Sequence, residues 1–200
     1  MHEIEIIVIG GSAGALEALL ALLPELPHGP DRGAIPVVVA MHLTPNQPSL
    51  LPDLLARVCA RPVYEVEDKH RLQPGTVCVA PPNYHVLVER DRSLALSVDA
   101  PVHFSRPSID VLFESAADAI GRGVAGVILS GANEDGARGL RRIVDAGGLA
   151  AIQDPTTAPH SEMPAAALRW SGAKTYSIAE LARWCASLAG PAILGQDARP

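Results

Sequence analysis

The fold is indicated first by residues 4–14, which read IEIIVIGGSAG. Ile4–Gly10 is an apolar run of strand length that ends in glycine, and Ala13–Leu23 follows it with apolar residues at helical spacing. The pattern repeats downstream, because Ile35–Met41 is a second apolar strand and Ser49–Cys59 is a second helix. This alternation of strand and helix predicts a parallel sheet with helices on its faces.

The rest of the chain keeps this alternation apart from one insertion. Residues 63–98 contain short strand patterns separated by turn signals, which predict a small antiparallel β extension. The other expected elements are helices at 108–120, 137–146, 164–170 and 178–188 and strands at 124–129 and 149–153. We therefore predict an α/β fold with a doubly wound, mostly parallel sheet flanked by helices. It forms one domain over residues 1–190, followed by a flexible tail at 191–200.

The composition excludes several classes of protein. The 200 residues are 48% hydrophobic and carry a net charge of −6, and no run of Lys or Arg forms a basic patch, so nucleic-acid binding is not expected. The apolar stretches are shorter than the roughly 20 residues that span a bilayer. The N-terminus also lacks the Lys or Arg of a secretory signal. We therefore expect a cytoplasmic protein without membrane insertion.

The three cysteines, Cys59, Cys78 and Cys185, are widely separated in the chain. None of them forms a C-x-x-C pair, so neither a disulfide framework nor a zinc site is indicated. We expect them to be small core residues in a reducing compartment, and we expect no metal and no cofactor.

Three predicted strands end in residues that can take part in catalysis. The first is followed by Ser12, the second by His42, and the strand at 124–129 by a loop that contains Asp135. In an open parallel sheet, functional residues gather at the carboxyl ends of the strands. A hydroxyl, an imidazole and a carboxylate are the groups that an activated serine nucleophile requires.

Each of these residues also has a simpler interpretation. Ser12 could cap the helix that follows it, and its glycine-rich turn loosely matches a dinucleotide-binding fingerprint. A dinucleotide site usually has an acidic residue at the end of the next strand, whereas this strand ends in His42. Asp135 could be a helix cap, and Glu134 is its nearest competitor for a catalytic role.

Taken together, these segments resemble the catalytic domain of the chemotaxis protein-glutamate methylesterases, the CheB-type enzymes. The similar stretches are Ile9–Gly14, His42, Val79–Asn83, Arg106–Phe113, Ser130–Gly139 and Glu162–Pro164, and the resemblance covers nearly the whole chain. It favours Asp135 over Glu134. It also implies a parallel α/β sheet and hydrolysis of glutamate γ-methyl esters on methyl-accepting chemotaxis receptors, with deamidation of selected receptor glutamines.

The resemblance assigns roles to individual residues. Ser12 would form an acyl-enzyme, His42 would be the base and Asp135 would orient it. Gly11, Ala13, Ala132 and Arg106 would form the substrate and oxyanion region, with backbone N–H groups near Ala132 and His42 as the oxyanion donors. Arg106 would touch the substrate or shape the rim of the site, unless it forms only a surface ion pair.

The sequence departs from the family pattern close to the expected nucleophile. Ala13 stands where the family often has Thr, and Ala132 stands where it often has Met. Both changes remove side-chain volume, which leaves open a signalling or interaction domain of the same fold with weak or no catalysis. His160 has no assigned role, and we expect it to be exposed to solvent.

The resemblance also implies partners and a mode of regulation. The partners would be the methylated cytoplasmic helices of chemoreceptors. Many members of the family carry an N-terminal receiver domain, but Ile4 already begins the first catalytic strand, so we expect no receiver in this chain. A separate regulatory protein could then control the enzyme.

Overall fold

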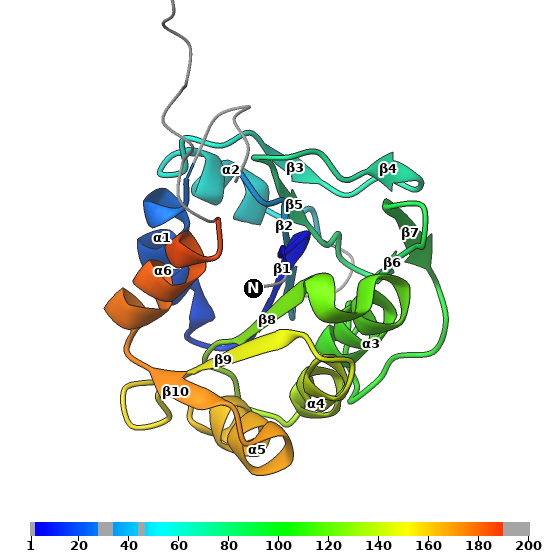
Figure 1. Cartoon of the computed structure of the whole chain (residues 1–200). Coiled ribbons are helices and arrows are strands. Elements are labelled where there is room, and N and C mark those ends of the chain that lie inside the picture. The colour runs from blue at the N-terminus through cyan, green and yellow to red at the C-terminus, as the bar shows by residue number, and fades with distance from the viewer. Residues whose placement is uncertain (1–2, 28–33, 44–46, 190–200) are drawn as a thin grey trace, which may run out of the picture.

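The centre of the structure is a seven-stranded parallel sheet (Figure 1). The structure is a computed structural model that describes residues 3–27, 34–43 and 47–189. Across the sheet the strands follow the order β10-β9-β8-β1-β2-β5-β3. They are β1 (Ile6–Gly11), β2 (Val37–Met41), β3 (Val63–Glu65), β5 (Val77–Val79), β8 (Val124–Ile128), β9 (Leu149–Gln153) and β10 (Lys174–Tyr176).

Helices cover both faces of this sheet, which confirms the predicted doubly wound α/β fold (Figure 1). One face packs against α1 (Ala15–Leu22), α2 (Leu51–Ala56) and α6 (Ile178–Ser187). The other face packs against α3 (Ile109–Ile120), α4 (Ala137–Asp145) and α5 (Glu162–Ser171). Two 3₁₀ helices, η1 (Leu23–Glu25) and η2 (Gly121–Gly123), extend α1 and α3.

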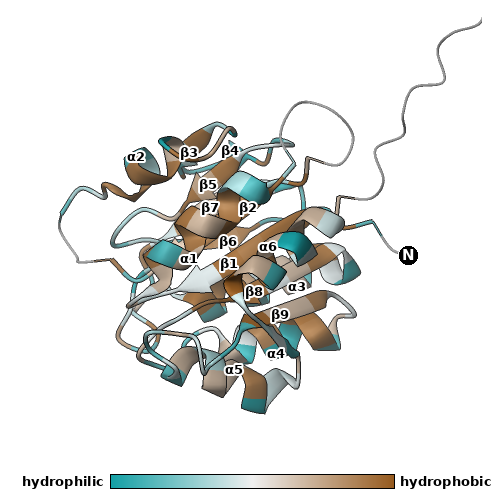
Figure 2. Ribbon diagram, turned by 90° about the vertical axis from the view of Figure 1, so that its left-hand side faces the viewer, coloured by the Kyte–Doolittle hydropathy of each residue, from teal (hydrophilic) through white to brown (hydrophobic). Residues whose placement is uncertain are grey.

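Strand β1 lies at the centre of the sheet and is buried on both sides. Ile7 and Ile9 pack into the core with α1, α2 and α6, whereas Ile6 and Val8 pack into the core with α3, α4 and α5. Because successive side chains of a strand point to opposite faces, burial of both faces requires the continuous apolar run seen in the sequence. Figure 2 shows the hydrophobic residues concentrated in the central strands.

The predicted antiparallel extension is present, but it includes only some of the strands in residues 63–98. It consists of β4 (His70–Arg71), β6 (His85–Val88) and β7 (Ser93–Ser97), paired in the order β4-β7-β6. Strands β3 and β5, which lie in the same region of sequence, join the parallel sheet instead. All three residues of β5 are buried and pair beside β2, and the more exposed β3 pairs with β5 at the edge of the sheet.

Two other elements differ from the sequence prediction. Strand β10 is a short, half-exposed edge strand that pairs only with β9, so it lacks the apolar run that would identify it. Helix α5 begins at Glu162, two residues before the predicted start. The expected tail at 191–200 lies outside the described residues.

The three cysteines are buried and free, as expected for core residues. Burial raises the pKa of the Cys78 thiol to about 11 and that of Cys185 to about 12, so both are protonated at neutral pH. In the part of the chain that the structure describes, every helix is too short or too polar to cross a bilayer.

The buried Arg61 forms hydrogen bonds to the backbone of the segments that follow η1 and precede β2. The Arg61 side chain is 4% exposed, and its guanidinium donates to the carbonyl oxygens of Pro27 and of Ile35, the latter at 2.7 Å. Burial lowers the pKa of this guanidinium. These bonds hold both ends of the connection between η1 and β2 against the segment that precedes β3.

We expect Arg61→Ala to lower the free energy of unfolding by about 2–3 kcal/mol, because a buried and a partly buried carbonyl group lose a charged donor. Urea denaturation followed by circular dichroism measures the change. Arg57→Ala is the matched control, since Arg57 is exposed and its removal should change the same quantity by less than about 0.5 kcal/mol. Equal effects of the two substitutions would contradict the structural role of Arg61.

Candidate active site

Ser12 and His42 leave neighbouring strands at the same level. Gly11 pairs with Met41 in the register of β1 and β2, and the backbone N–H of His42 donates to the carbonyl oxygen of Gly11 at 3.3 Å. This confirms that His42 ends the strand beside the one that leads to Ser12. Both residues therefore lie at the carboxyl edge of the sheet, where parallel sheets hold their functional sites.

Ser12 lies in a tight turn that leads into α1. The backbone N–H of Ala15 donates to the Ser12 carbonyl oxygen at 3.1 Å, and Gly14, the N-cap residue of α1, has a φ of 77°. No side chain caps α1, so the interpretation of Ser12 as a helix cap is wrong. Within residues 3–27, 34–43 and 47–189, the Ser12 hydroxyl has no hydrogen-bond partner and is available to a substrate.

His42 contacts Asp135 across the edge of the sheet. The Nε2 atom of His42 lies 2.8 Å from Oδ2 of Asp135, and the two side chains are 13% and 0% exposed. Glu134, the competing carboxylate, is exposed, so Asp135 is the acidic residue that orients the imidazole. Because the carboxylate occupies Nε2, Nδ1 is the ring nitrogen left to exchange a proton.

Asp135 binds the N-terminus of α3 as well as His42. Its Oδ2 accepts a bond from Ile109 N at 2.7 Å, and its Oδ1 accepts bonds from Ser108 Oγ at 2.9 Å and from Asp110 N at 3.0 Å. The first backbone N–H groups of a helix have no partner within the helix, and the helix dipole favours an anion there. The buried carboxylate therefore keeps its charge.

The pKa of Asp135 reflects this balance. Burial raises it, but the hydrogen bonds from His42, Asp110 N and Ile109 N outweigh burial and bring the pKa below its ordinary value. Asp135 is consequently ionised at neutral pH. An ionised carboxylate fixes the orientation of the imidazole and stabilises the imidazolium that forms when His42 takes a proton.

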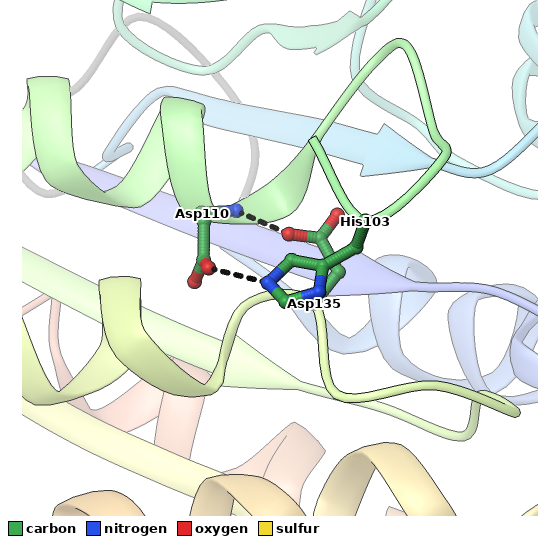
Figure 3. A group of neighbouring side chains, drawn as sticks. All are labelled: His103, Asp110 and Asp135. Carbon is green, nitrogen blue, oxygen red and sulfur yellow. Dashed lines mark hydrogen bonds and ion pairs between the residues drawn. The ribbon is translucent and has the colours of Figure 1, made fainter. Parts of the chain in front are cut away.

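A second buried carboxylate, Asp110, lies beside Asp135 (Figure 3). Its Oδ1 accepts a bond from Gly139 N at 2.7 Å, in the first turn of α4. Its Oδ2 lies 3.4 Å from Nε2 of His103 and 3.7 Å from Nε of Arg138. Burial raises the pKa of Asp110, and the charge of Asp135 adds to that effect.

His103, Asp110 and Asp135 come close enough together to suggest a metal site, since their ligand atoms all lie within 4.8 Å of one another. The hydrogen bonds argue against this use. Both oxygens of Asp135 already accept two donors each, and a cation would have to displace them. Asp110 also has the cationic Arg138 beside it. These three side chains therefore belong to a network of hydrogen bonds and ion pairs that joins parts of the protein, and not to a set of metal ligands.

Of the backbone N–H groups considered as oxyanion donors, some are free and one is already bonded. Ala13 and Ala132 are exposed, and their backbone N–H groups have no hydrogen-bond partner among the residues that the structure describes. The N–H of His42 is already bonded to Gly11 and is not available. Gly11 is buried, and a Cβ atom there would lie 2.6 Å from that of Ala15, so it serves close packing.

Arg106 forms hydrogen bonds to the backbone of the loop that precedes it. Its Nη1 donates to the carbonyl oxygens of Val98 at 2.7 Å and of Asp99 at 3.0 Å. The described part of the chain contains no carboxylate partner for it, so the surface ion pair is wrong. Arg106 instead holds the loop that carries His103 into the start of α3.

An apolar pocket of about 280 Å³ adjoins His42. Met41 and Leu43, which flank the histidine in sequence, form one wall, and Leu16 from α1 and Leu54 from α2 form others. An apolar group of a bound substrate can lie there without losing hydrogen bonds to water.

Sequence analysis missed two residues that build the site. Ser108 precedes an apolar helix and carries the signature of an N-cap, but nothing in the sequence indicates that its hydroxyl reaches Asp135. Asp110 lies in the stretch Arg106–Phe113 that is similar to the family, and nothing in the sequence indicates its own contacts. The side chain of His160 is exposed, as expected.

Comparison with known proteins gives a consistent result. Residues 7–184 match the family model described as CheB methylesterase. A relative from Leptospira interrogans is 44% identical over 164 residues, which cover 82% of this chain and 83% of the relative. A Bradyrhizobium diazoefficiens relative is 37% identical over 166 residues. Its name is "Protein-glutamate methylesterase/protein-glutamine glutaminase of group 2 operon", and the match covers 82% of this chain but only 41% of that protein.

The fold agrees with this result. The crystal structure of the Thermotoga maritima CheB methylesterase catalytic domain superposes with a TM-score of 0.86 at 25% identity, covering 94% of this chain and all of that domain. With a family model that spans most of its length, the chain belongs to the CheB methylesterase family.

Proposed function

We propose that this protein hydrolyses glutamate γ-methyl esters on methyl-accepting chemotaxis receptors, with Ser12, His42 and Asp135 as its catalytic residues. The observation that carries the proposal is the 2.8 Å contact between His42 and the buried, ionised Asp135, beside the strand end that holds Ser12. The names of the relatives support the same chemistry.

The proposed reaction uses these groups in sequence. Ser12 Oγ attacks the ester carbonyl carbon while Nδ1 of His42 takes the hydroxyl proton, and Asp135 stabilises the imidazolium. The imidazolium then gives its proton to the departing methoxide, so methanol leaves and an acyl-enzyme remains. Water attacks this ester with His42 as base, which releases the glutamate carboxylate and restores Ser12.

The tetrahedral intermediate needs donors for its oxyanion. We assign this role to the backbone N–H groups of Ala13 and Ala132, which are exposed and free of partners in the described residues. Loss of one such donor typically costs about 10²–10³-fold in rate. Arg106 shapes the rim of the site through its loop.

The same site supports deamidation of receptor glutamines. The names of the relatives include protein-glutamine glutaminase. An amide carbonyl accepts the same attack by Ser12, and His42 then gives its proton to the departing amide nitrogen, so that ammonia leaves in place of methanol.

The proposal extends to location and partners. A methylesterase of this kind acts in the cytoplasm on the methylated cytoplasmic helices of chemoreceptors, within a catalytic domain over residues 1–190. A separate regulatory protein would control it. The net charge of −6 disfavours nucleic acid as a partner.

A second candidate is an interaction domain with weak or no catalysis. The small residues Ala13 and Ala132 beside the nucleophile motivate it. It predicts that the protein binds receptors without releasing methanol. The retained contact between His42 and Asp135 favours the esterase.

Replacement of the nucleophile tests the main proposal. We expect Ser12→Ala to abolish methanol release from a receptor that carries labelled methyl esters, because no acyl-enzyme can form. Ser187→Ala is the matched control, since this exposed hydroxyl donates only to the Trp184 carbonyl and should leave the rate unchanged. Full turnover by Ser12→Ala would exclude Ser12, and no turnover by the natural protein would favour the interaction domain.

Asp135→Asn should lower kcat by about 10³–10⁴-fold, because the imidazole loses the charge that orients it. Asp110→Asn is the matched control, since Asp110 is equally buried but does not touch His42, and its kcat should fall by less than about tenfold. Similar losses in both variants would show that the effect comes from destabilisation of the helices.

The stability of Asp135→Asn should depend on pH in a defined direction. Because the pKa of Asp135 is lowered by folding, its charge stabilises the protein above the ordinary Asp value of about 4. That contribution disappears as the pH falls through the lower folded-state value. Urea unfolding of both proteins should therefore show a constant difference near pH 7 that narrows below about pH 4. A difference independent of pH would contradict an ionised Asp135.

A further inference from the structure

Ser130, just beyond the end of β8, is a buried residue whose every polar atom is bonded. It is 0% exposed, and its backbone N–H donates to Oε1 of Gln153 at 2.9 Å. Its hydroxyl also accepts a bond from the backbone N–H of His160 at 3.0 Å. Ser130 is therefore fixed to β9 and to the segment that precedes α5.

Two contacts of Ser130 hold the turn that carries Ser12. The carbonyl oxygen of Ser130 accepts a bond from the Ser12 backbone N–H at 2.9 Å. The hydroxyl of Ser130 donates to the carbonyl oxygen of Ala13 at 2.8 Å and lies 3.2 Å from the carbonyl oxygen of His160. A hydroxyl has one hydrogen, and the shorter distance assigns it to Ala13.

These bonds fix the peptide groups on both sides of the Ser12–Ala13 peptide. The backbone N–H of Ser12 and the backbone carbonyl of Ala13 are both hydrogen-bonded to Ser130. The peptide between them carries the Ala13 N–H, which we assign to the oxyanion hole. The two bonded peptide groups on either side therefore fix the direction of the Ala13 N–H, which forms no hydrogen bond of its own among the described residues.

The turn approaches Ser130 very closely. A Cβ atom on Gly14 would lie 2.9 Å from Oγ of Ser130 and 2.7 Å from Cβ of Pro159, and the φ of Gly14 is +77°. Glycine is the residue that accepts both this conformation and this contact. The chain after Ser130 is also held, because the backbone N–H of Gly131 donates to the carbonyl oxygen of His160 at 3.1 Å.

We propose that Ser130 is a positioning residue, whose hydroxyl, acting on the Ala13 carbonyl, sets the Ala13 N–H relative to Ser12, which the Ser130 carbonyl holds. The inference rests on the proposed function, because it requires Ser12 to be the nucleophile. Ser130 does not touch the reacting atoms. It acts through the Ala13 carbonyl, and the segment of His160 holds the hydroxyl from the opposite side.

The test compares Ser130→Ala, Ser130→Thr and Ser115→Ala in the full chain. Ser115 is a matched control, because its hydroxyl also donates to a carbonyl, that of Leu112, and accepts a backbone N–H, that of Val88, but it joins α3 to β6 away from the site. Each variant is assayed for methanol release, for thermal unfolding and for covalent labelling of Ser12 by a fluorophosphonate. In that labelling Ser12 Oγ bonds to phosphorus, fluoride leaves and His42 takes the proton.

For Ser130→Ala we expect kcat and the labelling rate to fall by about 10–100-fold, since small misplacements of reacting groups cost this much. KM should change by less than about threefold, because binding of the ester is not affected. Ser130→Thr keeps the hydroxyl and should recover both rates to within about threefold. Ser115→Ala should leave both rates unchanged at a comparable melting temperature.

Labelling at the natural rate in Ser130→Ala, or a loss matched by Ser115→Ala, would overturn the positioning role while leaving the esterase proposal intact. If the natural protein is labelled but releases no methanol, the proposed methyl-ester substrate is wrong. The comparison of labelling rates would still decide the role of Ser130. A natural protein that reacts with neither reagent would overturn both proposals.

Discussion

The structure depends on an exchange of hydrogen bonds between the N-termini of α3 and α4. Asp135, which precedes α4, accepts the first backbone N–H groups of α3, and Asp110 of α3 accepts the N–H of Gly139 in the first turn of α4. Backbone N–H groups at the start of each helix are therefore bonded by a carboxylate at the start of the other, in addition to the Ser108 N-cap of α3. Two carboxylates at 0% exposure would be costly if unpaired. The exchange gives donors to both oxygens of Asp135 and to Oδ1 of Asp110, whereas Oδ2 of Asp110 has no hydrogen bond among the described residues and lies near His103 and Arg138.

The exchange is possible because the backbones approach closely. A Cβ atom on Gly139 would lie 2.6 Å from that of Phe113, and one on Gly10 would lie 2.2 Å from Cγ2 of Ile109. Glycine at these positions lets α3 lie against both α4 and the end of β1. The glycine-rich turn after β1, which loosely matches a dinucleotide-binding fingerprint in sequence, and the loop after β8 here allow close packing around the site.

This arrangement connects the fold to its chemistry. The carboxylate that links the two helices also contacts His42, so the orientation of the candidate base depends on the packing of α3 against α4. The nucleophile turn is held separately, by Ser130 at the end of β8. Strands β1, β2 and β8 are neighbours in one parallel sheet, which brings both supports to a single edge.

The sequence by itself determined the alternating strands and helices, because apolar periodicity is local and both faces of the sheet are buried. It also identified Ser12, His42 and Asp135 as residues at strand ends, although their catalytic roles stay predictions. It left β10 unidentified, since a short edge strand has no apolar run. The tertiary structure alone decided the partners of Asp135, Asp110, Arg61 and Ser130. Their hydrogen bonds join segments that are about 25 or more residues apart, and no local pattern of residues encodes which donor will meet which buried acceptor.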